Sequence, residues 1–414
     1  MGLRLLYLPA YFFPEQAASS YLANNRNQAF ADADFDVVTY TATPCRGISS
    51  EVRAEYRKKE HRVERMYNGH MTIYRFSMFA EGRNPIMRAL RYVFCWVKQF
   101  YYGLKAKDID CIYLASTPPI QGFLGASLKK FKKIPFVYNL QDIFPDSLVG
   151  TGLTMKGTLL WRIGRVIENL TYRHADKIIV ISEDFKRNIM AKGVPEDKIA
   201  VVYNWADQNA VVNVDRSENK LIRKYNIDPK KFYVEYIGNM GLTQNMDMLL
   251  DVMKDLKDSH IDIGLIIVGE GTYKKQVEEI VKRDFLTNVI MLPFQPYEDI
   301  SHVFSLGDVG LIISKPGVGE NSFPSKTWSI MSASRPVLAN FDENEIKTIL
   351  SDNKCGIFTK AGDKEAFKNA IIKLYENRDL CKEYGRNGRE FIMQNLTREV
   401  GTQKYVDVIK SVVK

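Results

Sequence analysis

The sequence contains no uncharged apolar run long enough to cross a membrane, although hydrophobic residues make up 45% of its 414 residues. A membrane-spanning helix needs roughly 18 such residues in succession. The apolar part of the N-terminus, which ends at Pro9, is also too short for a signal peptide and instead predicts a first strand. We therefore expect a protein that neither spans the membrane nor is exported.

Cysteine is scarce, and its spacing shows no pairs. The chain has Cys45, Cys95, Cys111, Cys355 and Cys381. This spacing argues against a zinc cluster or a disulfide framework, and it predicts packing residues in a reducing compartment. The chain also lacks a full Gly-x-Gly-x-x-Gly motif followed by a ribose-binding acid, which disfavours a nicotinamide oxidoreductase.

The net charge of +9 is concentrated in part in the stretch 83–107. Its basic residues interleave with apolar and aromatic residues between Ile86 and Leu104, as in a helix that lies at a lipid interface. We expect this stretch to bind the cytoplasmic membrane surface. A mostly buried helix with a solvated basic face is the alternative. No RNA-binding or helix-turn-helix signature is present, so nucleic acid is not an expected partner.

The length suits about two domains of roughly 200 residues each. Both halves alternate short apolar runs with helical stretches, which predicts parallel sheets covered on both faces. Strands are expected at 4–8, 36–40, 71–76, 111–115, 136–140, 177–181 and 200–202, and then at 232–237, 263–268 and 308–313. The polar stretch 206–231 is predicted to be a linker, and 399–413 a final amphipathic helix.

Three predicted strands in the second half end in small residues or at a helix start. The loops that follow contain Gly238, Asn239 and Gly241, then Gly269 and Gly271, and finally Ser325 and Lys326. Such loops can present backbone N–H groups to an anion, and a lysine there adds a positive charge. We therefore predict a diphosphate site, against the alternatives of ordinary turn glycines and a solvent-facing lysine.

Strand ends in the first half also carry candidate residues. Ligands of open α/β sheets bind beyond the carboxyl ends of the strands. The candidates for binding an anionic or hydroxylic group are Phe13, Glu15, Ser19, Ser116 and Gln141. Asp142, just past a predicted buried strand, is a catalytic candidate because it can accept a proton or orient a sugar hydroxyl. The alternative is a loop or helix-capping hydrogen bond.

Several motifs together resemble a known family. They are Tyr-Ile-Gly-Asn-Met-Gly at 236–241, Val-Gly-Glu-Gly at 268–271, Pro-Ser-Lys at 324–326, Arg-Pro-Val at 335–337, His-Ala-Asp-Lys-Ile-Ile-Val-Ile-Ser at 174–182 and Tyr-Asn-Trp-Ala-Asp at 203–207. Over nearly its whole length the chain resembles retaining glycosyltransferases of the GT-B fold, in family 4 (group 1). The segments 116–119 and 142–147 resemble those of bacterial capsule and O-antigen repeat-unit enzymes of the fucosamine transferase type.

The resemblance implies an α/β protein with two Rossmann-like α/β/α domains that face a central cleft. Residues 1–205 would bind the acceptor, 206–395 would bind the nucleotide sugar, and the helix in 396–414 would return to the first domain. No metal or other cofactor is expected. Lys326 would neutralise the leaving diphosphate, Phe294 would lie near the base, and Glu320 would hold hydroxyls of the donor sugar.

The chain departs from the commoner family pattern at several site positions. Many relatives have an arginine and a lysine where this chain has Asn239 and Gln244, so we expect amide and backbone donors, together with Lys326, to meet the phosphates. The second of two glutamates found in many relatives falls at Ser329. The first corresponds to Glu320 or Asn321.

The expected function is transfer of a sugar, with retention, from a nucleotide sugar. The donor is predicted to be a UDP-sugar, and the acceptor a polyprenyl-diphosphate-linked saccharide. The enzyme would be cytoplasmic, on the inner face of the bacterial cell membrane, and would serve capsule or O-antigen synthesis. The alternatives are a sugar-nucleotide epimerase of the same fold and a non-catalytic nucleotide or lipid binder. Product analysis separates transfer from epimerisation, whereas a binder shows affinity without turnover.

Overall fold

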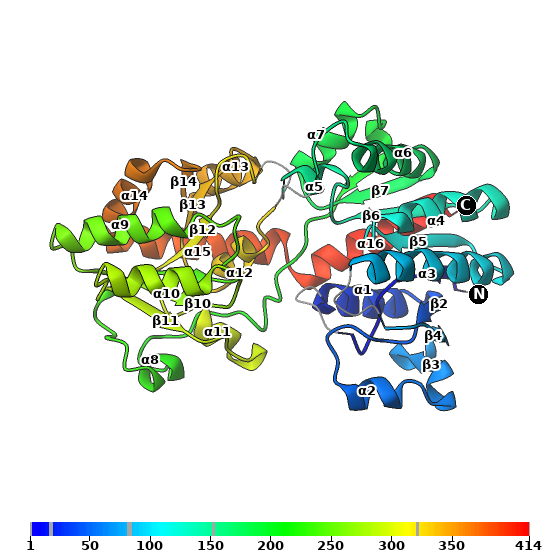
Figure 1. The fold of residues 1–414 in the computed structure, drawn as a ribbon, viewed down its shortest axis with the longest axis horizontal. Helices are drawn as coiled ribbons and strands as arrows, with labels where there is room; N and C mark the ends of the chain where they lie inside the picture. The colour runs from blue at the N-terminus through cyan, green and yellow to red at the C-terminus, as the bar shows by residue number, and fades with distance from the viewer. Residues whose placement is uncertain (1, 16–19, 81–84, 151–153, 320–322, 414) are drawn as a thin grey trace. The chain divides into compact units, whose positions relative to one another are not determined.

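The computed structural model describes residues 2–15, 20–80, 85–150, 154–319 and 323–413. The chain divides into two compact units. The first comprises Met1–Asn204 and Glu399–Lys414, and the second comprises Trp205–Arg398. Each unit has a sheet with helices on both faces, as the alternation of apolar runs predicts (Figure 1).

The first unit contains an eight-stranded sheet of order β3-β4-β2-β1-β5-β6-β7-β8. The strands are β1 (Arg4–Tyr7), β2 (Asp36–Ala42), β3 (Val63–Met66), β4 (Met71–Phe76), β5 (Cys111–Ala115), β6 (Phe136–Leu140), β7 (Lys177–Val180) and β8 (Ile199–Val201). Only β3 is antiparallel to its neighbour. It escaped prediction because it is a short edge strand without a buried residue, so no apolar pattern marks it.

The helices α3, α4 and α6 pack side by side on this unit. A Cβ atom added to Gly103 of α3 would lie 2.8 Å from Leu128 of α4, and one at Gly122 of α4 would lie 2.5 Å from Thr171 of α6. The unit's helices are α1 (Ser20–Asp32), α2 (Ser50–Glu55), α3 (Pro85–Lys105), α4 (Ile120–Lys132), α5 (Asp146–Gly150), α6 (Leu159–His174), α7 (Glu183–Ala191) and α16 (Arg398–Val412).

The final helix α16 belongs almost entirely to the first unit. The Tyr405 hydroxyl donates a hydrogen bond to Oδ1 of Asn139 in β6, at 3.1 Å. Tyr405 is 2% exposed, and its ring meets the ring of Tyr113 in β5 edge-on, at 6.4 Å between centroids. This hydrogen bond and ring contact therefore attach the helix to β5 and β6 of the first sheet.

The second unit contains a wholly parallel sheet of order β11-β10-β9-β12-β13-β14. The strands are β9 (Phe232–Ile237), β10 (Ile263–Val268), β11 (Val289–Leu292), β12 (Val309–Ile313), β13 (Val337–Phe341) and β14 (Gly356–Lys360). The direction of strand succession reverses between β9 and β12. This topological switch point is where ligands bind in open α/β sheets, beyond the carboxyl ends of the strands.

Helices cover both faces of the second sheet. Residues of α9, α10 and α14 join the core on one face, whereas α8 and α11 contribute to the apolar cluster on the other. The helices are α8 (Lys220–Lys224), α9 (Met246–Asp258), α10 (Lys274–Arg283), α11 (Ile300–Val303), α12 (Lys326–Ser332), α13 (Glu345–Asp352), α14 (Lys364–Glu376) and α15 (Arg378–Asn395). Single turns of 3₁₀ helix lie at Lys59–Arg62, Tyr67–Gly69, Glu196–Lys198 and Tyr297–Asp299.

The prediction of a linker at 206–231 is wrong. The Val212 amide donates to Ser301 Oγ at 3.0 Å, and Asn219 Nδ2 donates to the His302 carbonyl at 2.8 Å. Asn219 also caps α8. The polar side chains that suggested a solvated linker therefore satisfy backbone groups of the second unit, a distinction that composition alone does not make.

Helix α3 exposes its apolar side. Within the described residues, no helix is both long and apolar enough to cross a bilayer. The stripe of α3 consists of Ile86, Leu90, Val93, Val97, Tyr101 and Leu104, each between 39% and 71% exposed. Arg91 is instead 2% exposed, and it donates to the carbonyls of Phe79 and Thr43. The alternative of a mostly buried helix is therefore wrong, although the basic residues Arg88 and Lys105 are exposed as it expected.

Candidate active site

The loops after β9 and β10 pack against each other without room for side chains. The Gly238 amide donates to the Val268 carbonyl at 2.9 Å, and the Met240 amide donates to the Glu270 carbonyl at 2.8 Å. A Cβ atom at Gly269 would lie 1.9 Å from the Gly238 oxygen. A Cβ at Gly271 would lie 2.1 Å from the Met240 oxygen. The predicted glycines thus permit two adjacent backbone loops at the carboxyl edge of the sheet.

Lys326, the first residue of α12, places its ammonium group at this edge. Nζ lies 4.4 Å from the centroid of the Tyr236 ring, and a Cβ atom at Gly238 would lie 2.6 Å from it. Burial lowers the pKa of Lys326 to about 8. In the part of the chain that the structure describes, no carboxylate pairs with it. The lysine is therefore a desolvated cation beside the β9 turn, suited to an anionic ligand.

Asn239 and Gln244 shape the turn after β9. Gln244 Oε1 accepts a hydrogen bond from the Gly241 amide at 2.9 Å. The Tyr236 hydroxyl donates to the Asn239 carbonyl at 2.7 Å. These bonds hold Gly241 and Asn239 in place. The Gln244 side chain therefore stabilises the conformation of the loop. Sequence reasoning missed Tyr236, because its position inside a buried strand looks like that of an ordinary core residue.

The remaining predicted donor residues lie at the same edge or outside the described residues. Ser325 is exposed just before α12, and its side chain makes no capping hydrogen bond. Phe294 is 73% exposed in the loop after β11. Glu320 and Asn321 fall outside the described residues.

In the first unit, the structure brings Ser116 and Gln141 together. Ser116 Oγ accepts from the Gln141 amide at 2.9 Å. Gln141 Nε2 donates to Asn139 Oδ1 at 2.8 Å and to the Tyr405 hydroxyl at 3.3 Å, and Gln141 Oε1 accepts from Asn204 Nδ2 at 2.9 Å. Tyr405 is 264 positions from Gln141, so no local sequence signal pointed to this network.

Asp142 follows Gln141 at the end of β6. Part of the residue is exposed, but neighbouring protein atoms desolvate its carboxyl group and raise its pKa. Oδ2 accepts from Ser147 Oγ at 3.1 Å. The carboxyl group borders a small cavity of about 10 Å³ that Phe144 and Tyr172 also line. A carboxyl group with a raised pKa is suited to exchanging a proton or hydrogen-bonding a hydroxyl.

The loop after β1 contains the predicted residues Phe13 and Glu15, which both make hydrogen bonds within the first unit. Both carboxylate oxygens of Glu15 accept backbone N–H groups, from Phe12 at 3.0 Å and from Cys45 and Arg46 at 2.8 and 2.9 Å. Glu15 therefore joins two loops of the first unit. Phe13 is 47% exposed, and its carbonyl accepts from Arg75. Ser19 lies outside the described residues.

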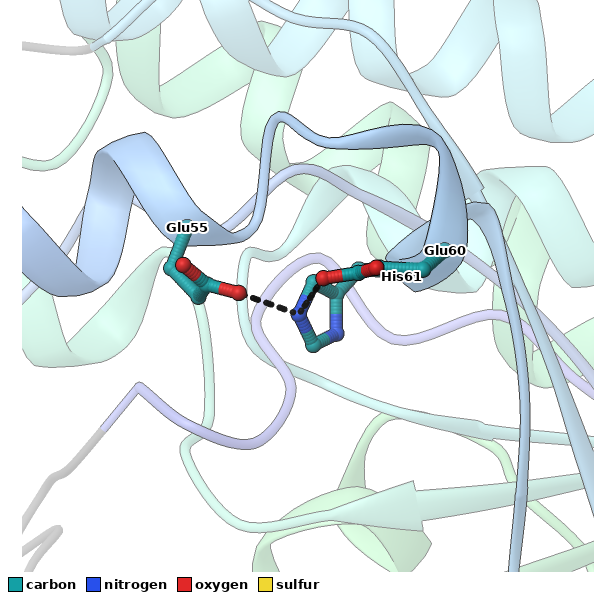
Figure 2. A group of neighbouring side chains, drawn as sticks. All are labelled: Glu55, Glu60 and His61. Atoms are coloured by element: carbon teal, nitrogen blue, oxygen red, sulfur yellow. Dashed lines mark hydrogen bonds and ion pairs between the residues drawn. The ribbon is translucent and has the colours of Figure 1, made fainter.

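One group of possible metal ligands occurs among the described residues, namely Glu55, Glu60 and His61 (Figure 2). His61 contacts Glu55 at 3.3 Å and Glu64 at 3.0 Å, and the hydrogen bond to Glu64 is the main reason that its pKa is raised. Lys58 also pairs with Glu55. These contacts make the group an ion-pair cluster at the edge of the first sheet.

Two α/β units built on mainly parallel sheets, one with closely packed glycine loops beside a lysine, are the arrangement of the GT-B class. The Anabaena protein HepE, solved in complex with UDP, superposes with a TM-score of 0.72 at 17% identity, over 99% of this chain and all of that one. The likeness shows the fold. The prediction of two Rossmann-like domains is thereby confirmed.

Sequence comparison then gives the family. The model for glycosyltransferase family 4 matches residues 27–210, and the model for glycosyl transferases group 1 matches 217–391. The chain is 23% identical to a probable glycosyltransferase, WbjE, of Pseudomonas aeruginosa over 74% of this chain and 76% of that protein. It is 24% identical to a putative colanic acid biosynthesis glycosyl transferase, WcaI, of Escherichia coli over about half of each chain. The chain is a group 1 glycosyltransferase with the GT-B fold.

Proposed function

We propose that the enzyme transfers a sugar, with retention, from a UDP-sugar to a polyprenyl-diphosphate-linked saccharide in surface polysaccharide synthesis. The observation that carries the donor assignment is the desolvated Lys326 ammonium beside the Gly238 turn. UDP in the HepE complex and the putative role of WcaI in colanic acid biosynthesis support the donor and the pathway class. A hexosyl or N-acetylhexosaminyl group of the fucosamine type remains our proposal for the sugar.

In this proposal, charge stabilisation at the diphosphate lowers the main barrier. The bond between the anomeric carbon and the diphosphate oxygen breaks, and the acceptor hydroxyl bonds to the same face of the sugar. Its proton passes to the departing phosphate. Lys326 and the Asn239 amide neutralise the charge that develops on the diphosphate. Asp142 hydrogen-bonds a hydroxyl of the acceptor, and Ser116 and Gln141 shape the edge beside it.

We also propose that the first unit rests on the inner face of the cell membrane through α3. Helix α6 also exposes apolar residues, because Leu159, Leu160, Ile163 and Val166 are 50% to 74% exposed. Exposed apolar areas of this kind mark interaction surfaces. Arg88 and Lys105 of α3 add cations, which favour anionic lipid.

Replacing Val93 by glutamate tests the membrane proposal. Val93→Glu is expected to weaken binding to vesicles of phosphatidylglycerol and phosphatidylcholine about tenfold, since burying one valine contributes roughly 1.5 kcal/mol or more. Val63→Glu is the matched control, because Val63 is similarly exposed, at 55% against 50%, but lies on β3. Co-sedimentation measures both variants. Equal binding by the two variants would contradict a lipid contact through α3.

The function itself is tested by nucleotide release from the purified enzyme. UDP-, GDP- and dTDP-sugars are supplied with and without a lipid-diphosphate saccharide mixture. We expect release from a UDP-sugar that depends on acceptor and persists in EDTA, with an α-linked product from an α-linked donor. Conversion of the donor without acceptor would identify an epimerase, and nucleotide binding without turnover would identify a non-catalytic binder. Either result would overturn the proposal.

A further inference from the structure

The second unit contains a cavity of about 740 Å³. It lies at the end of the strands opposite to the glycine loops. Lys230, Asp308 and Pro336 line it, and they lie just before the first residues of β9, β12 and β13. Gly238 and Gly269 instead follow the last residues of β9 and β10. The strands of this sheet are parallel, so the cavity and the proposed donor site lie at opposite ends of the strands.

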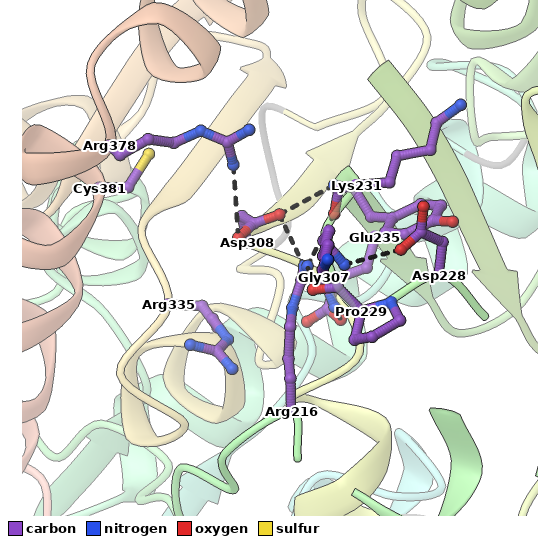
Figure 3. A network of polar contacts seen from close by, with 12 residues as sticks. Arg216, Asp228, Pro229, Lys231, Glu235, Gly307, Asp308, Arg335, Arg378 and Cys381 are labelled. Atoms are coloured by element: carbon purple, nitrogen blue, oxygen red, sulfur yellow. Dashed lines mark hydrogen bonds and ion pairs between the residues drawn. The ribbon is translucent and has the colours of Figure 1, made fainter. Parts of the chain in front are cut away.

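Positive charge dominates the lining of this cavity. Seven lining residues are cationic, namely Arg216, Lys230, Arg335, Arg378, Lys382, Arg386 and Arg389, and two are acidic, Asp308 and Glu390. Asp308 is already engaged, because its Oδ2 accepts from Arg216 and from the Tyr233 amide at 2.7 and 2.8 Å (Figure 3). The acids of the lining therefore leave most of its positive charge uncompensated.

Two arginines are available to a ligand. Arg335 Nε is buried without a hydrogen-bond partner, and burial lowers the pKa of this guanidinium. Arg386 is exposed on α15 and has no ionic partner among the described residues. A buried donor that lacks an acceptor costs free energy, which an incoming oxyanion would recover.

The buried carboxyl group of Glu235 attracts the Arg335 guanidinium without forming a direct ion pair with it. Glu235 is 1% exposed, and its Oε2 accepts from the Gly307 amide at 2.6 Å, whereas its Oε1 has no hydrogen-bond partner. Burial raises the pKa of Glu235 to about 7. No ion pair joins Glu235 to Arg335 within the described residues, and Figure 3 shows the two side chains apart. The cationic side chains of the lining thus still outnumber the acidic ones.

We propose that this cavity binds the phosphate groups of a phosphate ester, separately from the donor. The planar guanidinium forks of Arg335 and Arg386 match phosphate oxygens. The volume lies in the range of small-molecule sites and exceeds the needs of a single inorganic ion. Among the described residues, none in the lining is an aromatic on which a base can stack, so a phosphorylated sugar or a lipid phosphate fits better than a nucleotide.

Calorimetric titration of the full-length protein with fructose 1,6-bisphosphate tests this site, with fructose as the uncharged control. We expect saturable binding that persists in Lys326→Ala and weakens about tenfold in Arg386→Gln, the loss expected for one charge-assisted contact. Lys275→Gln is the matched control, because Lys275 is exposed on α10 outside the cavity. Equal weakening in Arg386→Gln and Lys275→Gln would show general charge attraction and overturn the site.

Vesicles distinguish the two sources of the phosphate. If phosphatidylglycerol vesicles bind in an Arg386-dependent manner and the soluble bisphosphate does not bind, the ligand is a lipid phosphate. If neither probe binds in a manner that depends on Arg386, the proposal fails. Because Lys326 is the reference for the donor site, failure here leaves the proposed transfer reaction unaffected.

Discussion

Replacing Lys326 by methionine is expected to lower kcat/KM for sugar transfer about 10³-fold, the effect of removing a group that stabilises transition-state charge. Methionine keeps an unbranched side chain against the Tyr236 ring, so the unfolding midpoint should not fall. Lys347→Met, at an exposed position of α13, is the control for the loss of a lysine. Full activity of Lys326→Met in steady-state assays would contradict the assigned role.

The same lysine predicts a pH dependence of donor binding. The pKa of Lys326 is lowered to about 8, so the free enzyme carries the ammonium below this pH and loses it above. UDP binding should therefore weaken as pH rises above about 8, and binding there should take up a proton. Calorimetry in buffers of different ionisation enthalpy measures the uptake. Lys326→Arg, which stays protonated, should bind UDP without it.

Replacing Gly269 by alanine should reduce the free energy of unfolding of the second unit by about 3 kcal/mol or more and abolish UDP binding. Its φ of 156° and the Gly238 oxygen, 1.9 Å from the added Cβ, leave no space for a methyl group. Backbone must move, which separates the two loops beside Lys326. Chemical denaturation and UDP titration measure the two effects.

Gly317→Ala isolates the cause of this loss. Gly317 also has a positive φ, 78°, but an added Cβ would meet nothing within 4 Å. Its replacement should cost only about 1 kcal/mol, the price of the backbone conformation. If Gly269→Ala and Gly317→Ala lose equal stability, the close approach of the two loops does not explain the need for glycine at 269.

The sequence predicted ten of the strands of the two sheets but missed β3, β11, β13 and β14, of which β13 is fully buried. The central strands of both sheets, such as Ile263–Val268, are fully buried and read directly as apolar runs. The failures involve residues whose neighbours are distant in sequence. Arg91 looked solvated, yet it satisfies loop carbonyls of the first unit, and Asn219 looked like part of a linker, yet it donates to the distant His302 carbonyl.

For the site, strand ends and helix starts predicted the meeting of Gly238 with Lys326, because the topology of a parallel sheet brings them to one edge. The hydrogen bonds that Tyr236, Gln244 and Tyr405 make could be found only in the structure. For a tyrosine inside a strand or in the final helix, the neighbouring sequence does not show which group its hydroxyl will hydrogen-bond. The charge of the second cavity was equally hidden, since its cations come from separate parts of the chain.

Hydrogen–deuterium exchange of the full-length enzyme with and without UDP tests the central claim most directly, because it reports on the backbone that is assigned to the diphosphate. We predict that UDP slows exchange in peptides covering 237–245, 268–274 and 325–330, with no change in 378–390. Saturating UDP that leaves the first three segments unchanged and protects another part of the chain would contradict the account.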